Sequence, residues 1–211
     1  SIITYTGTGA SGTIAHGLGA RPKWISIKNR DASEQWFING ELITGNTNGS
    51  FHYNTDDEYT GGSNNMTASS VDTNNIHVIS SGNVNTDGQK YVAYVFTEIQ
   101  GYSKFSKYKG NGSSDGQFVY TGFKPGWLMT KNINGTDANW HIYDSKRNTH
   151  NVIGEQLYAN LSNAGADATD LDFLSNGFKW RRDVTGGNAS GTDFVYMAFA
   201  EHPFVSSKGV P

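Results

Sequence analysis

The stretch from Trp140 to Arg147 combines side chains that suit a sugar ligand. It reads Trp-His-Ile-Tyr-Asp-Ser-Lys-Arg. Alternate residues of an extended strand point to opposite faces, which places Trp140 and Asp144 on one face and His141 and Tyr143 on the other. Aromatic rings offer flat apolar surfaces to the C–H faces of a sugar, and Asp144 and Arg147 offer hydrogen bonds to its hydroxyls. We therefore predict a ligand-binding cluster made of Trp140, His141, Tyr143, Asp144 and Arg147.

A second interpretation of the same stretch is purely structural. In it, Trp140 belongs to a buried core and Asp144 forms an ion pair with Arg147. Trp36 favours this interpretation because it matches Trp140 in the repeat described below. The residues after Trp36, Phe-Ile-Asn-Gly-Glu, lack the Asp and Arg of the later stretch. If the stretch binds a ligand, only the later copy is expected to do so.

Two acidic runs supply oxygen ligands of the kind that calcium prefers. One run is 56–58, and the other places Asp167, Asp170 and Asp172 at near-alternate positions. Neither has the glycine and glutamate spacing of an EF-hand loop. Asp167, Asp170 and Asp172 are candidate calcium ligands, with a solvated loop as the alternative. No other cofactor is expected.

The sequence contains no motif of a known catalytic site. It has no cysteine, and its six histidines form no HExxH pair. No G-x-S-x-G elbow is present, and the glycine-rich stretch 110–116 lacks the Lys-Ser/Thr of a phosphate-binding loop. A glycosidase needs two facing carboxyls, for which the sequence gives no sign. We expect a protein that is not an enzyme.

Composition and charge exclude several classes of partner. The net charge is −3 and the isoelectric point is about 6.0, so the basic surface of a nucleic-acid-binding protein is missing. No apolar run is long enough to span a bilayer, so membrane insertion is not expected. Glycine accounts for 26 of the 211 residues, aromatic residues for 13% and charged residues for only 17%. This composition, with its short apolar runs, favours an all-β protein over a helical bundle.

The chain repeats itself after about 103 residues. Tyr5–Gly9 matches Tyr108–Gly112, and Pro22–Trp24 matches Pro125–Trp127. The glycine and aromatic pattern of 88–98 recurs at 191–201. We predict a tandem duplication with a first unit at 1–101, a second unit at 102–205 and a tail at 206–211.

Each unit has the pattern of an antiparallel β-sandwich. The alternating run Ile76–Ile79 and the apolar run Phe194–Ala200 are typical of strands, and Asn-Gly and Asp-Gly turns separate such runs. Proline enters the strands that begin near Trp24 and Trp127, because proline is tolerated at the start of a strand. The predicted fold is all-β, with two sequence-related sandwich-like units. Because Ser1 falls within the first repeat's opening strand, the chain is expected to be a piece of a longer protein.

Several motifs resemble a known family. They are Gly110–Trp127, Trp140–Arg147, Leu157–Asn160, Asp172–Phe178 and Tyr196–Phe204, together with His16–Pro22 of the first unit. In this order they resemble a duplicated β-module found in structural proteins of tailed phages, especially marine phages, which are described as tail-fibre-like. The resemblance covers nearly the whole chain. It implies a virion location, other virion proteins as partners and a homo-oligomer, for which we expect a trimer.

Four functions are compared on this basis. The first is a virion structural protein on the particle exterior that adheres to polysaccharide of the host surface. The alternative is a capsid decoration protein that binds other virion subunits, with no receptor and no enzymatic activity. A depolymerase fits less well, because tailspike enzymes have much shorter β-helix repeats. A cellular carbohydrate-binding module is a further alternative. Adhesion predicts an exposed aromatic cluster around His141 and Tyr143.

Overall fold

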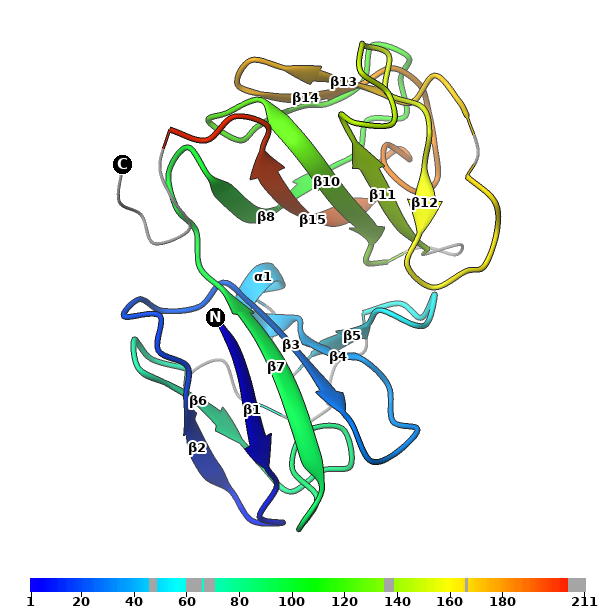
Figure 1. Cartoon of the computed structure of the whole chain (residues 1–211). Coiled ribbons are helices and arrows are strands. Elements are labelled where there is room, and N and C mark those ends of the chain that lie inside the picture. Colours follow the sequence, from blue (N-terminus) through cyan, green and yellow to red (C-terminus); the bar gives the residue numbers. More distant parts are fainter. Residues whose placement is uncertain (46–48, 60–65, 67–70, 135–138, 166, 205–211) are drawn as a thin grey trace. The chain divides into compact units, whose positions relative to one another are not determined.

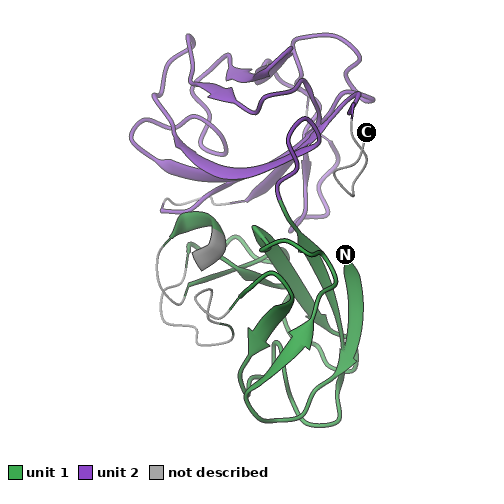
Figure 2. Ribbon diagram, turned by 90° about the vertical axis from the view of Figure 1, so that its left-hand side faces the viewer, with its two compact units in different colours: residues 1–97 green, residues 98–211 purple. Residues whose placement is uncertain are grey.

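The chain folds into two compact units, Ser1–Thr97 and Glu98–Pro211 (Figure 2). The computed structural model describes residues 1–45, 49–59, 66, 71–134, 139–165 and 167–204. The predicted boundary after residue 101 stays a prediction. The Glu98 carboxylate accepts a hydrogen bond from the Phe105 backbone N–H at 3.2 Å, which ties Glu98 to the second unit. The predicted tail at 206–211 lies outside the described residues.

Unit 1 contains two antiparallel sheets (Figure 1). The five-stranded sheet has the order β1 (Ile2–Thr6), β7 (Lys90–Phe96), β3 (Trp24–Asn29), β4 (Phe37–Asn39) and β5 (Ser50–His52). The second sheet pairs β2 (Gly12–Ala15) with β6 (Asn75–Val78). The short helix α1 (Glu41–Thr44) joins β4 to β5. Within the described residues, no helix has the length and apolarity needed to cross a membrane.

Unit 2 has the same layout with a larger second sheet (Figure 1). Its five-stranded sheet has the order β12 (Leu157–Tyr158), β11 (Trp140–Asp144), β10 (Pro125–Asn132), β15 (Asp193–Ala200) and β8 (Ser103–Lys109). Its three-stranded sheet has the order β13 (Leu171–Leu174), β14 (Gly177–Trp180) and β9 (Phe118–Tyr120). The all-β, sandwich-like fold class predicted from the sequence is confirmed.

The hydrophobic core of each unit lies between its two sheets. In unit 2, Tyr196 of β15 and Leu128 of β10 pack with Phe178 and Trp180 of β14. In unit 1, Ala93 of β7 packs in the same core as β6 residues. Successive side chains of a strand alternate between faces, so every second residue of β7 and β15 enters the core. Burial of these apolar side chains is the main source of each unit's stability.

The two units correspond in strand order and in local hydrogen bonding. When each five-stranded sheet is listed from its first strand, β1 or β8, the matching strands follow in the same order. The buried Asn85 accepts a hydrogen bond from the Thr8 N–H at 2.8 Å, and the buried Asn188 accepts one from the Asn111 N–H at 3.1 Å. The origin of this correspondence in an internal duplication stays a prediction.

The two tryptophans that follow the strand-entering prolines differ in their burial. Trp24 pairs with Phe96 and Trp127 pairs with Phe199, so they occupy matching places in the two sheets. Trp24 is fully buried and donates a hydrogen bond to the Tyr53 hydroxyl at 2.7 Å. Trp127 is only partly buried. Of these two tryptophans, only Trp24 is therefore a buried core residue.

Buried tyrosines make the fold sensitive to alkaline pH. Burial raises the pKa of Tyr5, Tyr108, Tyr143 and Tyr196 above the ordinary value. A phenol whose pKa is raised on folding stabilises the protein fully below the unfolded pKa of about 10, and this stability is lost as the pH rises above it. We expect the denaturation midpoint to fall steeply above about pH 10, with phenolate absorbance appearing at unfolding. An unchanged midpoint up to about pH 12 would contradict this burial.

Candidate functional site

The structure buries two of the predicted ligand-binding residues. His141 is 5% exposed and Tyr143 is 0% exposed, because both point from β11 into the core of unit 2. The Tyr143 ring packs edge-to-face against Trp180 of β14, so the second sheet covers this face of β11. The expectation of an exposed aromatic cluster around these two residues is therefore wrong.

His141 and Tyr143 belong to a buried network of polar side chains. The His141 ring nitrogen Nδ1 lies 2.9 Å from the Gln156 amide oxygen. The Tyr143 hydroxyl donates to the buried Asp170 carboxylate at 3.0 Å, and Arg182 Nε lies 2.7 Å from the other Asp170 oxygen. Burial, followed by the nearby Asp170 charge, raises the pKa of Tyr143. Buried polar groups need such partners, so this network stabilises the fold.

The two features that the structural interpretation of the Trp140–Arg147 stretch predicts are both present. Trp140 is 0% exposed, and the Lys131 ammonium lies 5.4 Å from the centre of its ring. Arg147 Nε forms an ion pair with Asp144 Oδ2 at 2.9 Å. The other Asp144 oxygen accepts hydrogen bonds from the backbone N–H groups of Lys146 and Arg147, each at 2.9 Å. Asp144 thus shapes the loop that follows β11.

Replacing Asp144 with alanine is expected to lower the free energy of unfolding of unit 2 by about 1–2 kcal/mol, because two backbone donors lose their acceptor. Denaturant unfolding followed by circular dichroism measures the change. Asp193→Ala is the matched control, since it removes a solvent-exposed ion pair with Lys109 and is expected to cost at most about 1 kcal/mol. Equal effects of both variants would contradict the role of Asp144 in the loop.

The three candidate calcium ligands are in different environments. Asp170 is buried and paired with Arg182, and Asp172 accepts a hydrogen bond from Arg181 Nε at 2.6 Å. Asp167 is exposed. In the described part of the chain, no three acidic, histidine or cysteine residues form a group suited to a metal ion. The structure brings Asp170 and Asp172 to one end of β13, where each is neutralised by an arginine.

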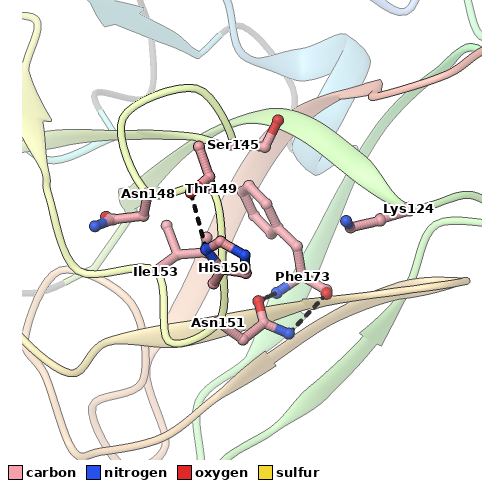
Figure 3. Close-up of a pocket in the computed structure, with 8 residues that line it drawn as sticks. All are labelled: Lys124, Ser145, Asn148, Thr149, His150, Asn151, Ile153 and Phe173. Atoms are coloured by element: carbon pink, nitrogen blue, oxygen red, sulfur yellow. Dashed lines mark hydrogen bonds between the residues drawn. The ribbon is translucent and has the colours of Figure 1, made fainter.

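A pocket of about 370 Å³ opens beside the loop that Asp144 shapes (Figure 3). The residues that line it are Lys124, Ser145, Asn148, Thr149, His150, Asn151, Ile153 and Phe173. Ile153 and Phe173 are buried and form an apolar floor, whereas Thr149 and His150 are exposed at the rim. In Figure 3, Lys124 lies on the opposite side of the Phe173 ring from Asn148. The volume is within the range of small-ligand sites.

Backbone hydrogen bonds hold the pocket loop in place. The Asn148 side-chain oxygen accepts from the N–H groups of Gly154 and Glu155, at 2.9 and 2.7 Å. Asn151 donates to the Phe173 carbonyl at 3.0 Å and accepts from the Phe173 N–H at 2.9 Å, which ties the loop to β13 (Figure 3). The loop therefore presents Thr149 and His150 from a fixed backbone. Their side chains lie within hydrogen-bond distance, at 2.9 Å between Oγ1 and Nδ1.

Apart from the Lys124 ammonium, the polar side chains of the pocket lining are hydroxyl, amide and imidazole groups. Hydroxyl, amide and imidazole groups both donate and accept hydrogen bonds. Among the described lining residues, none carries a carboxylate. The nearby Glu201 is paired with Lys124 at 2.7 Å, and this hydrogen bond lowers the pKa of Glu201. The arrangement can bind a polyhydroxylated ligand, and the pocket lining lacks the facing carboxyls that glycoside hydrolysis requires.

Sequence reasoning missed the residues that form this pocket. It ended the candidate cluster at Arg147, just before Asn148, Thr149 and His150. A signal was present in the chain, because residues 145–151 form a polar run that directly follows a predicted strand. Binding residues are concentrated in such loops at strand ends.

Comparison with known proteins identifies a family and gives no relative of known function. Neither the curated proteins nor the solved structures searched contain a match. A family described as a domain of unknown function matches residues 1–203, which cover both units and the pocket. The chain therefore belongs to the DUF7483 family.

Proposed function

We propose that the protein is a structural component of the exterior of a phage particle and adheres to polysaccharide on the host surface. The phage assignment is supported by the resemblance of ordered motifs across both units. Adhesion is supported by one observation above the others: the open pocket of unit 2 combines neutral hydrogen-bonding side chains with an apolar floor. Sugars match this lining, because they carry hydroxyls around apolar C–H faces.

The pocket lining favours binding over hydrolysis. Two acidic residues beside the pocket loop, Asp144 and Glu201, are paired with Arg147 and Lys124. A glycosidase needs one carboxyl that donates a proton and a second that acts as nucleophile or base. We therefore propose a role without catalysis, in which the other partners are virion proteins and further copies of this chain. If the protein binds no glycan, capsid decoration without a receptor is the function that we propose instead.

The test is binding of the labelled, intact protein to host cells and to a panel of bacterial polysaccharides. We expect saturable binding, and we expect EDTA to leave it unchanged because Asp170 and Asp172 are paired with arginines. Binding that EDTA abolishes would instead support calcium at the acidic run. Absence of binding to every cell and polysaccharide at micromolar concentration would overturn the adhesion proposal in favour of decoration.

Thr149→Ala/His150→Ala is expected to weaken polysaccharide binding about tenfold, because two hydrogen bonds of roughly 0.5–1.5 kcal/mol each are lost. Both residues are exposed, so the unfolding midpoint is expected to stay unchanged. Asn163→Ala/Thr169→Ala is the matched control, since it also removes polar side chains from exposed positions of unit 2. Equal affinities of the two double variants would contradict a role of this pocket.

A further inference from the structure

Two aromatic side chains of β9 point away from the core of unit 2. Phe118 is 38% exposed and Tyr120 is 65% exposed, whereas Val119 between them is buried. Residues two apart on a strand share a face and lie about 6.6 Å apart. The hydrophobic effect would favour the opposite register, with both rings in the core. Their exposure therefore has no structural benefit for the fold.

Unit 1 shows that the fold accepts small residues at these places. Val119 pairs with Phe178 on β14, as Ile14 pairs with Ile76 on β6. The next backbone hydrogen bonds also match, from Thr121 N–H to the Asn176 carbonyl at 3.0 Å and from His16 N–H to the Asn74 carbonyl at 2.9 Å.

In this register, Thr13 occupies the place of Phe118 and Ala15 the place of Tyr120. The same strand geometry thus forms with a hydroxyl and a methyl group. The exposed rings are a feature of unit 2 alone, and they add an aromatic surface that the fold does not need.

Polar groups surround each ring. A second pocket of about 370 Å³ is lined by Glu98, Gln100, Ser103, Lys104, Tyr120, Thr121 and Gly122. Within it, Lys104 Nζ lies 3.3 Å from Glu98 Oε1. Beside Phe118, its cross-strand neighbour Lys179 pairs with Asp115 at 2.5 Å, and this contact lowers the pKa of Asp115. The Tyr120 ring thus borders a hollow that offers carboxylate, amide, hydroxyl and ammonium groups.

This chemistry fits a sugar ring better than a protein partner. A flat ring stacks on the apolar face of a pyranose, and the charged and amide groups of the hollow hydrogen-bond the hydroxyls at its edge. A stable protein interface covers about 800 Å² per partner around a core depleted of charge. Two separate rings flanked by the Lys104–Glu98 and Lys179–Asp115 ion pairs do not form such a core.

We infer that unit 2 carries a second carbohydrate-binding site, in which a sugar ring stacks on Tyr120 within the hollow formed by Glu98, Gln100 and Lys104, with Phe118 extending the surface along β9. This inference rests on the proposed adhesion to glycans, and it adds a site separate from the Thr149–His150 pocket. Two sites on one unit bind a polysaccharide with higher avidity than a short oligosaccharide, which occupies one site at a time.

The test uses Phe118→Thr/Tyr120→Ala, which gives unit 2 the residues that unit 1 has at these places. The control is Ile2→Thr/Leu161→Ala, which removes two other exposed apolar side chains. The intact protein and both variants are titrated with the polysaccharide that binds best in the panel, and with its oligosaccharide fragments. Aromatic carbon–proton NMR spectra follow the Tyr120 ring during the oligosaccharide titration.

We expect the β9 variant to bind the polysaccharide about tenfold more weakly at an unchanged unfolding midpoint, and the control to bind like the intact protein. We also expect the Tyr120 ring signals to shift on addition of the oligosaccharide. Normal polysaccharide affinity of the β9 variant, with unshifted Tyr120 signals, would overturn the second site and leave adhesion through the Thr149–His150 pocket in place. If the intact protein binds no glycan, the second site and the proposed function both fail.

Discussion

Replacing Trp180 with alanine is expected to lower the free energy of unfolding of unit 2 by about 3–5 kcal/mol. Trp180 is fully buried and packs edge-to-face against Tyr143 and Phe178. Its ring nitrogen donates a hydrogen bond to the Tyr108 hydroxyl at 3.1 Å. The variant loses the largest side chain of β14, leaves a cavity between the two sheets and removes a buried hydrogen-bond donor.

Circular dichroism during denaturant unfolding and native-state hydrogen exchange measure this effect, and the exchange rates assign it to one unit. Val78→Ala is the control, because Val78 is the buried residue of β6 that matches Trp180 in the repeat. We expect it to destabilise unit 1 by about 2 kcal/mol, since two methyl groups are removed. A change below about 1 kcal/mol for Trp180→Ala would contradict a core centred on this residue.

Replacing Asn188 with alanine is expected to destabilise unit 2 by about 3 kcal/mol, because a fully buried side chain loses three hydrogen bonds. The side chain accepts from the Asn111 N–H at 3.1 Å and donates to the Ser113 and Arg182 carbonyls at 2.9 and 3.1 Å. These bonds join the loop after β8 to the turn before β15. Asn188→Asp keeps the acceptor but places a carboxylate oxygen against two carbonyls, so it is expected to be destabilising as well.

The matching variant in unit 1 is Asn85→Ala. Asn85 accepts from the Thr8 N–H and donates to the Ala10 carbonyl at 2.6 Å. Hydrogen exchange is expected to accelerate in unit 1 for this variant and in unit 2 for Asn188→Ala. If either asparagine can be removed without loss of stability, the correspondence between the two loops has no energetic role.

The fold was largely predictable because its signals are local. Proline cannot donate to a sheet, and Pro125 is the first residue of β10 as expected. The apolar run Phe194–Ala200, rich in aromatic and β-branched residues, correctly predicted a strand, which is β15. The repeat pattern does not encode the contacts of Glu98 with Lys104 and Phe105, which link this residue to unit 2.

The site was much less predictable, for physical reasons that individual residues show. Side chains of β11 point alternately to its two faces. Trp140 on one face and His141 on the other are both buried, so the polarity of the residues does not show which face is exposed. The pocket depends on the path of the 145–151 loop, which Asn148 and Asn151 fix through backbone hydrogen bonds. The outward rings of Phe118 and Tyr120 contradict the rule that aromatic residues of a strand face the core.

The partners of Asp170 and Asp172 could not be predicted from the sequence either. Asp170 and Asp172 have a spacing that fits metal ligands as well as it fits ion pairs. The hairpin of β13 and β14 brings Arg181 and Arg182 to these carboxylates, and this pairing is a tertiary effect. Sequence spacing alone therefore left calcium binding and a solvated loop as the alternatives, and it gave no sign of the arginine pairing.

The most direct test of glycan adhesion is a binding titration of the intact, labelled protein against the polysaccharide panel and host cells. The Thr149→Ala/His150→Ala variant and the Asn163→Ala/Thr169→Ala control are titrated in parallel. The account predicts saturable binding by the intact protein and the control, and about tenfold weaker binding by the pocket variant. Saturable binding that is the same for all three proteins would contradict the assignment of the pocket, and absence of binding would contradict adhesion itself.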